Sequence, residues 1–350
     1  MRSSYKEEDV KLLLKDITGL VEPQSAEERE KLIQSGRSYC EMLPIEYKPS
    51  DKYMSIYNEL VKVFAHKNAH AIGRLADQII EAKGKNVVLV SLARAGIPIG
   101  ILLKHYIKFK YNINVPHYSI SIIRGRGIDK NAMNYILERH NANDLLFVDG
   151  WTGKGAISRQ LEEALIDYPS VSKDLAVIAD PAGVAKYYGT REDLLIPSCC
   201  LNSTVSGLIS RTFLRDDIIS ENDFHGAVYY GELKEHDLSY DFINSIERHF
   251  SKDVEYDSIV NFNDTGLDEA RHIAKEYNIS DINLVKPSIG ETTRVLLRRV
   301  PWKVLISNKC KDDIDVSHII RLAEEKGTPV EYVDLIHYKA CGLIKELADI

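Results

Sequence analysis

The sequence has no long hydrophobic run. Its apolar stretches fall well short of the ~20 residues that a membrane-spanning helix requires, and the start Met1-Arg2-Ser3 opens no apolar segment of the kind found in secretory signals. We therefore expect a cytoplasmic protein that has no membrane partner.

Cysteine is scarce as well. The 350 residues include five cysteines, an odd number without the spacing of a metal-binding knuckle. Because thiols stay reduced in the cytosol, we expect structural or incidental roles for Cys40, Cys199, Cys200, Cys310 and Cys341. A peptidase would need a thiolate at Cys199 or Cys200 with His225 or His117 as its base. The sequence places no such pair together and has no nucleophile signature around these cysteines.

An excess of positive charge is also missing, since the net charge is −7. A uniform negative field repels nucleic acid, so any contact with RNA requires a local basic patch.

The sequence does have a regular alternation of short apolar runs and helical patterns. Continuous valine-rich runs are typical of parallel strands that are covered on both faces. The expected strands are 86–91, 117–123, 144–148 and 174–179, and the expected helices are 98–110, 131–140 and 155–168. This order predicts an α/β fold with a doubly wound parallel sheet and right-handed crossovers.

The residues before this unit predict a helical extension. Ser25 and Glu28 have the spacing of a capping box, and a helix from there would carry Leu32, Ile33, Tyr39 and Met42 on one face. A second helix is expected from just after Ser50 to just before Gly84. Residues 214–255 are polar, with a helix expected at 240–250, and they predict a connection between two domains.

A glycine-bearing loop at residues 149–156 is the most specific motif. Asp149 ends an apolar strand, at the edge where open α/β sheets bind ligands. The glycines let backbone amides converge, and the N-terminus of the next helix adds a positive end. We therefore expect a phosphate-binding loop made of Asp149, Gly150, Thr152, Gly153, Lys154, Gly155 and Ala156.

Two further loops have similar chemistry. After the first strand, the amides of Ala93, Arg94, Ala95 and Gly96 can face an anion, and Arg94 adds charge. After the second strand, Arg124 and Arg126 alternate with glycines and suit a flexible flap that attracts anions. An ordinary turn or a solvated basic loop explains each alone, but the three in this order favour one ligand site.

These three loops resemble those of type I phosphoribosyltransferases. The resemblance implies that Asp149 holds the ribose of phosphoribosyl pyrophosphate, that Arg94 holds pyrophosphate, and that Arg124 and Arg126 close over it. It also implies Mg²⁺ as cofactor, bound through the substrate, with Asp149 as the one protein group near its waters. Gly150 stands where the family has a second acid.

A serine-rich segment at 197–212 follows the last expected core strand. Its hydroxyls and amide suit a polar acceptor, although a capped helix start with polar filler is the alternative. The residues expected at the acceptor pocket, or at a contact between domains, are Asn202, Ser203, Thr204, Ser206 and Arg211.

The C-terminal part repeats the α/β alternation. Helices are expected at 267–277, 290–299, 316–326 and 339–348, and strands at 282–285, 303–307 and 329–333. Residues 286–311 carry seven basic side chains against one acid, Glu291. This patch predicts contact with a phosphate backbone, and a solvated helix face is the alternative.

The run 286–309 resembles the Pelota and kink-turn-binding ribosomal protein superfamily, with Gly290, Glu291 and Arg294 at matching positions. The asparagine that is usual beside the glutamate is absent. The resemblance implies RNA binding by Lys286, Gly290, Glu291, Arg294, Arg298 and Arg299.

Four segments are thus expected: a helical extension (1–84), a phosphoribosyltransferase-like core (85–213), a connection (214–255) and a Pelota-like domain (256–350). This combination resembles a bacterial family encoded with tellurite-resistance and stress-response genes, also labelled cysteine protease StiP. It implies a Mg²⁺-dependent phosphoribosyltransferase, or an enzyme that makes or cuts a related ribosyl-phosphate bond, with a nucleobase-like or RNA-linked acceptor.

The second hypothesis is an RNA-binding regulator that senses a nucleotide, which the glycine at position 150 favours. A cysteine peptidase is the third. The expected partners are a small ribosyl phosphate and, through the C-terminal domain, RNA. The sequence leaves the oligomeric state open, a homodimer included.

Overall fold

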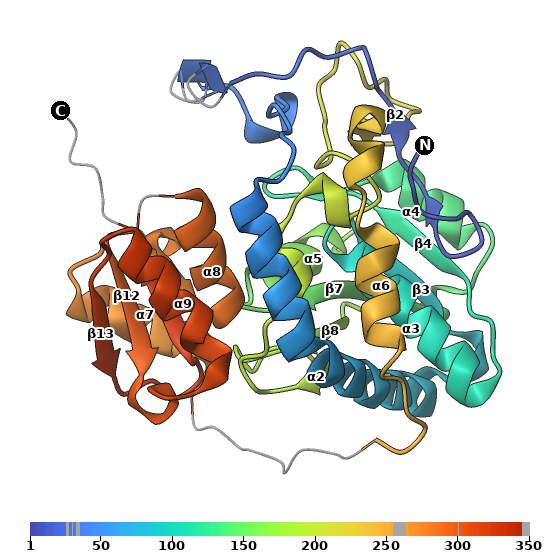
Figure 1. Cartoon of the computed structure of the whole chain (residues 1–350). Coiled ribbons are helices and arrows are strands. Elements are labelled where there is room, and N and C mark those ends of the chain that lie inside the picture. Colours follow the sequence, from blue (N-terminus) through green and yellow to red (C-terminus); the bar gives the residue numbers. More distant parts are fainter. Residues whose placement is uncertain (26–27, 30, 33–35, 255–263, 300, 345–350) are drawn as a thin grey trace.

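A computed structural model describes residues 1–350 except 26–27, 30, 33–35, 255–263, 300 and 345–350. A six-stranded sheet organises the larger domain and a four-stranded sheet the smaller one. Figure 1 shows the smaller domain, in orange and red, beside the blue helix α2 (Asp51–Lys83) of the larger domain.

The six-stranded sheet has the order β1-β4-β3-β7-β8-β9, and every neighbouring pair is parallel. Its strands are β1 (Lys11–Leu12), β3 (Val88–Leu92), β4 (His117–Ile120), β7 (Leu145–Trp151), β8 (Leu175–Ala179) and β9 (Tyr187–Thr190). The predicted doubly wound α/β fold is therefore confirmed, with β1 and β9 as strands that the sequence analysis does not anticipate. Chain order reverses between β3 and β7, where the carboxyl ends of the strands leave a crevice for a ligand.

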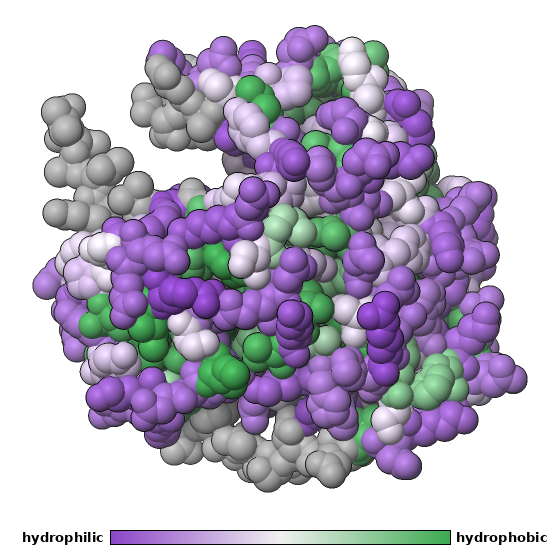
Figure 2. Space-filling view, in the orientation of Figure 1, coloured by the Kyte–Doolittle hydropathy of each residue, from purple (hydrophilic) through white to green (hydrophobic). Residues whose placement is uncertain are grey.

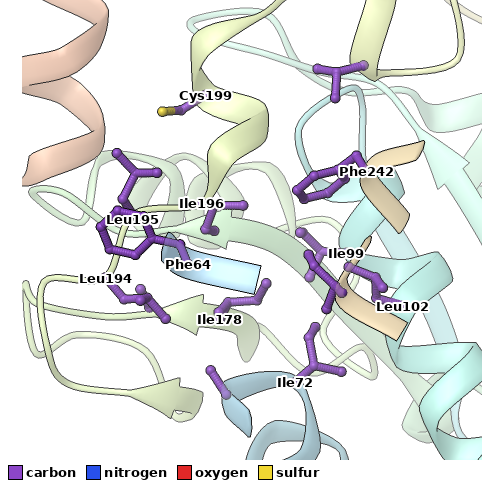
Figure 3. Close-up of a cluster of buried hydrophobic side chains, with 14 of the residues drawn as sticks. Phe64, Ile72, Ile99, Leu102, Ile178, Leu194, Leu195, Ile196, Cys199 and Phe242 are labelled. Atoms are coloured by element: carbon purple, nitrogen blue, oxygen red, sulfur yellow. The ribbon is translucent and has the colours of Figure 1, made fainter. Parts of the chain in front are cut away.

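Successive residues of the central strands pack against opposite layers, because side chains alternate along a strand. Leu89 and Val148 pack with α2, α3 (Gly96–Tyr111) and α6 (Ser239–Glu247). Val90 and Phe147 pack with α4 (Lys130–Leu137) and α5 (Ala156–Ala164). Figure 3 shows side chains of α2, α3 and α6 converging on Ile178 of β8.

The N-terminal extension differs in part from the expectation. The predicted capping box is present, since the Ser25 amide donates to Glu28 Oε2 at 2.9 Å and the Glu28 amide to Ser25 Oγ at 3.2 Å. The prediction that Tyr39 and Met42 lie on one helical face is wrong. Tyr39 is 60% exposed whereas Met42 is buried, and Tyr39 begins a separate 3₁₀ turn. Ile33 lies outside the described residues. A short strand, β2 (Lys15–Asp16), pairs in parallel with β10 (Gly226–Ala227).

The smaller domain has the strand order β11-β14-β12-β13. The strands are β11 (Val285–Pro287), β12 (Lys303–Ser307), β13 (Val330–Val333) and β14 (Ala340–Leu343), and the helices are α7 (Gly266–Glu276), α8 (Ile289–Arg298) and α9 (Ile314–Glu325). The predicted helix at 339–348 is wrong over residues 340–343, which form a buried strand paired antiparallel with β11 and β12. Residues 345–348 of that helix lie outside the described residues.

Polar residues cover most of the face seen in Figure 2, and apolar residues appear there in small groups. Across the described ranges, every helix is too short or too polar to cross a membrane.

Candidate functional site

A cleft of about 340 Å³ lies where the two domains meet. The larger domain contributes residues of all three predicted loops, and the smaller domain contributes the start of α8 and the strand before it. The residues that line it are Ala95, Arg124, Asp149, Trp151, Thr152, Gly153, Lys154, Ala156, Ile157, Asn283, Lys286, Pro287, Glu291 and Arg294. The structure thus brings the predicted phosphate loop and part of the predicted RNA-binding surface to one cleft.

Asp149 is the carboxylate at the centre of the larger domain's wall. It belongs to β7, and its Oδ1 accepts a hydrogen bond from the Gly150 amide at 2.8 Å. Burial raises the pKa of Asp149 to about 6, while the Gly150 amide and the positive charge of Arg294 act in the opposite direction. A carboxylate with such a pKa is charged at neutral pH and can accept hydrogen bonds from the hydroxyls of a ligand.

The loop after β7 presents its backbone to the cleft. Gly155 has a φ of +70°, which suits glycine, and α5 begins directly after it. The Thr152 hydroxyl donates to buried Asp180, and Lys154 Nζ donates to the carbonyls of Ile282 at 2.6 Å and Val285 at 2.8 Å. These two side chains are committed to protein contacts, and the Thr152 amide donates to the Ala179 carbonyl at 3.1 Å. The amides of residues 153–156 and the N-terminus of α5 therefore remain as the phosphate-binding groups.

The pKa of the Lys154 ammonium is shifted by its position in the cleft. Burial lowers the pKa of Lys154 to about 8, and the nearby charge of Lys286 acts in the same direction. Its two carbonyl contacts tie the loop to the smaller domain.

The loop after β3 packs closely on β7. A Cβ at Gly96 would lie 2.3 Å from the Val148 carbonyl oxygen, so this approach requires glycine. The Ala93–Arg94 peptide bond is cis. Ala95 lines the cleft, whereas Arg94 donates to the Ile209 carbonyl at 2.8 Å and lines a smaller adjoining pocket of about 80 Å³.

The predicted flap is a short hairpin of β5 (Ile122–Ile123) and β6 (Gly127–Ile128). Arg124 lines the cleft. Arg126 is exposed and is not among the residues that line it. The hairpin therefore brings one of its two arginines to the cleft.

The smaller domain forms the opposite wall with Lys286, Glu291 and Arg294. Ser288 caps α8 by accepting from the Glu291 amide at 3.3 Å, and Arg294 pairs with Glu291 at 3.3 Å. A Cβ at Gly290 would lie 3.7 Å from the Trp151 ring. Arg299 is exposed and does not line the cleft, and the side chain of Arg298 lies outside the described residues.

Two buried contacts hold the walls together. The Asp193 carboxylate accepts from the amides of Ile289 at 3.0 Å and Lys339 at 2.9 Å, and burial raises the pKa of Asp193 to about 7. The Tyr338 hydroxyl donates to the Gly153 carbonyl at 2.6 Å. No role for these residues or for Asp180 is expected from the sequence. Asp180 directly follows a strand, as Asp149 ends one, and that signal could have found it.

The predicted acceptor residues divide into two groups. Asn202 and Ser206 line the smaller pocket, which shares Ala95, Trp151 and Arg294 with the cleft. The other three are not among its lining residues: Ser203 bonds Glu46, Thr204 is buried beside a separate pocket of about 180 Å³, and Arg211 donates to the Met42 carbonyl.

All five cysteines are buried. Cys199 lines the smaller pocket, and Figure 3 shows its sulfur pointing away from the other labelled side chains of the cluster. A Cβ at Gly290 of α8 would lie 4.0 Å from this sulfur. His117 bonds Ser91 at 2.7 Å and the Asp9 carbonyl at 2.8 Å, and burial lowers its pKa to about 3. His225 bonds Ser121 at 2.8 Å. Both candidate bases thus have partners elsewhere.

Comparison with known proteins gives a match along each part of the chain. The family described as tellurite-like stress resistance cysteine protease StiP matches residues 3–247, and the PELOTA RNA binding domain matches residues 264–346. A protein of Acinetobacter baylyi named cysteine protease StiP is 38% identical over 365 aligned residues, which cover 98% of this chain and 94% of that protein.

Two solved structures are similar to a smaller part. A hypoxanthine-guanine phosphoribosyltransferase of Bacillus anthracis is 16% identical, with a TM-score of 0.27, over 35% of this chain and 76% of that one. A xanthine-guanine-hypoxanthine phosphoribosyltransferase of Helicobacter pylori is 19% identical, with a TM-score of 0.23, over 41% and 80%. Scores this low say nothing about the ligand of this chain.

Proposed function

This chain belongs to the StiP family of tellurite-like stress resistance proteins and carries a Pelota RNA-binding domain, and we propose that its cleft is a phosphoribosyltransferase site. The donor is phosphoribosyl pyrophosphate or a related ribosyl phosphate, taken with Mg²⁺. The acceptor is a nucleobase-like or RNA-linked group.

One observation carries the proposal. A strand-end carboxylate, a glycine-bearing loop that opens a helix, and three further cations line one cleft. They are Asp149, the loop residues Thr152, Gly153, Lys154 and Ala156, and the cations Arg124, Lys286 and Arg294. A ribosyl phosphate with a pyrophosphate group has the matching chemistry. Its hydroxyls donate to a carboxylate, and its phosphates accept from amides and from cations.

In the proposed reaction the protein forms no covalent bond to the substrate, and its residues orient the reactants and stabilise charge. The bond between ribose C1 and the pyrophosphate oxygen breaks, pyrophosphate leaves with the electron pair, and an acceptor nitrogen bonds to C1 and loses a proton. Asp149 would orient the ribose and stabilise the positive charge that develops on it. Arg124 and Arg294 would stabilise the negative charge on the leaving group.

The residues also fit Mg²⁺. This ion keeps several waters and is held by one or two carboxylates together with substrate phosphates, and the cleft offers Asp149 and Glu291. Within the described ranges, acidic, histidine and cysteine side chains form no cluster of three or more that could hold a metal. When bound, Mg²⁺ would neutralise charge on the pyrophosphate.

Calorimetry with phosphoribosyl pyrophosphate and Mg²⁺ tests this function. We expect wild type to bind and Asp149→Asn to lose binding. Asp144→Asn is a matched control, because Asp144 precedes the same strand at its other end. Absence of binding by folded wild type would refute the proposal.

RNA binding is a second candidate function, supported by the PELOTA match and by Lys286 and Arg294 on one wall. Each phosphate contact contributes to the salt dependence of affinity. Lys286→Ala should therefore weaken RNA binding and reduce the slope of log affinity against log salt by about one. An unchanged slope would contradict a role for this wall.

The family description and the relative's name also mention a cysteine protease, and Cys199 lines the pocket beside the cleft. A casein-cleavage assay of wild type and Cys199→Ala distinguishes the functions. Cleavage that depends on Cys199 would favour the peptidase over the transferase.

A further inference from the structure

The larger domain provides one carboxylate at the end of β7, because Gly150 follows Asp149. We propose that the second carboxylate of the ligand site comes from the smaller domain, and that Glu291 of α8 binds the ribose hydroxyls, or the waters of the bound cation, together with Asp149. This inference rests on the proposed function, and it assigns to the C-terminal domain a part of the ligand site itself.

Glu291 has the position for this role. It lines the same cleft as Asp149, and its side chain is 28% exposed, so it is accessible to a ligand. A Cβ at Gly153 would lie 3.9 Å from Glu291 Cγ and 3.6 Å from the Pro287 carbonyl oxygen. The first turn of α8 therefore packs directly on the phosphate loop.

The contact between the two walls is fixed by buried polar bonds. Asp193 accepts from the Ile289 amide at the first turn of α8, Tyr338 donates to the Gly153 carbonyl, and Lys154 donates to two carbonyls just before the turn. These bonds hold the first turn of α8, which carries Glu291, beside the phosphate loop.

The direction in which ligand affinity changes when the charge of Glu291 is removed tests this inference. Phosphoribosyl pyrophosphate is an anion, and a carboxylate that merely stood beside it would repel it. Removal of that charge would then tighten binding. A carboxylate that accepts hydrogen bonds from ribose hydroxyls, or holds the waters of a cation, has the opposite effect, so its removal weakens binding.

Glu291→Gln keeps the shape of the side chain and removes its charge. In full-length protein, we expect calorimetry to show about 10- to 100-fold weaker binding of phosphoribosyl pyrophosphate with Mg²⁺. Glu324→Gln is the matched control, since Glu324 is an exposed residue of α9 in the same domain. Thermal unfolding of each variant checks that it is folded.

The outcomes are separate for the two proposals. Loss of binding in Asp149→Asn and in Glu291→Gln, with both variants folded, supports both proposals. Unchanged or tighter binding by Glu291→Gln, with loss in Asp149→Asn, overturns the role of Glu291 and leaves the proposed function standing. Absence of binding by folded wild type overturns both.

Discussion

Replacement of Asp180 by alanine should destabilise the larger domain strongly. Asp180 directly follows β8 and is fully buried. Its oxygens accept from the Thr152 hydroxyl, the Arg191 guanidinium, and the amides of Val184 at 3.2 Å and Ala185 at 2.7 Å. The variant leaves all four donors without this acceptor.

The magnitude follows from the pair with Arg191. Breaking a buried ion pair by removal of one partner costs about 3–5 kcal/mol. The Arg191 side chain keeps 26% of its exposure and stacks on the Tyr188 ring at 3.7 Å from the centroid, so we expect the lower end, about 3 kcal/mol. That is a large share of the roughly 5–15 kcal/mol by which a domain is stable.

Urea unfolding followed by fluorescence measures this loss. The chain has two tryptophans, Trp151 in β7 and Trp302 just before β12, and a Trp302→Phe background makes the signal report the larger domain. Asp217→Ala is the control, because its ion pair with Arg215 is exposed and should contribute less than about 1 kcal/mol. A loss below about 1 kcal/mol in Asp180→Ala would refute the reasoning.

Three further predictions concern the cleft between the domains and the phosphate loop beside it. Gly155→Ala should cost about 1–2 kcal/mol and weaken ligand binding, because φ there is +70° and a Cβ would lie 3.2 Å from Val184; full stability in urea would contradict this. Tyr338→Phe removes the bond to the Gly153 carbonyl and should cost about 1 kcal/mol, with faster hydrogen exchange in the phosphate loop. The pKa of Asp149 is raised from 3.8 to about 6, so the folded protein holds this proton more tightly than the unfolded chain and loses stability as pH rises from about 4 to 6. Asp149→Asn should remove about 1–2 kcal/mol of that loss. The test is the difference in urea midpoint between variant and wild type, and the same difference at pH 4.5 and at pH 7 would contradict the prediction.

The sequence predicts the α/β core well because its signals are local. Strand β7 and the loop after it are visible as an apolar run, an acid and a set of glycines, and the strand bounds differ from the prediction by a few residues at most. The edge strand β9 is missed because it is only four residues long and contains Gly189, a residue type that is depleted in strands. That glycine has a long-range cause, since a Cβ there would lie 2.4 Å from the Ala71 carbonyl oxygen of α2.

The error at β14 has a similar origin. Residues 340–343 precede a run whose composition favours a helix, yet they lie buried between β11 and β12. Their pairing partners are distant in the chain, so local preference does not determine the structure.

The shared cleft could not be predicted from the sequence either. It depends on contacts such as the one between Tyr338 and Gly153, which are 185 residues apart. Local motifs predict each wall separately, but the meeting of Asp149 and Glu291 at one cleft follows from the docking of the domains.

A crystal structure of the full chain with phosphoribosyl pyrophosphate and Mg²⁺ tests the central claim most directly. The account predicts the 5′-phosphate at the amides of residues 153–156, the ribose hydroxyls at Asp149, and the pyrophosphate toward Arg124 and Arg294. A ligand bound at any other place, or an empty cleft at a saturating ligand concentration, would contradict it.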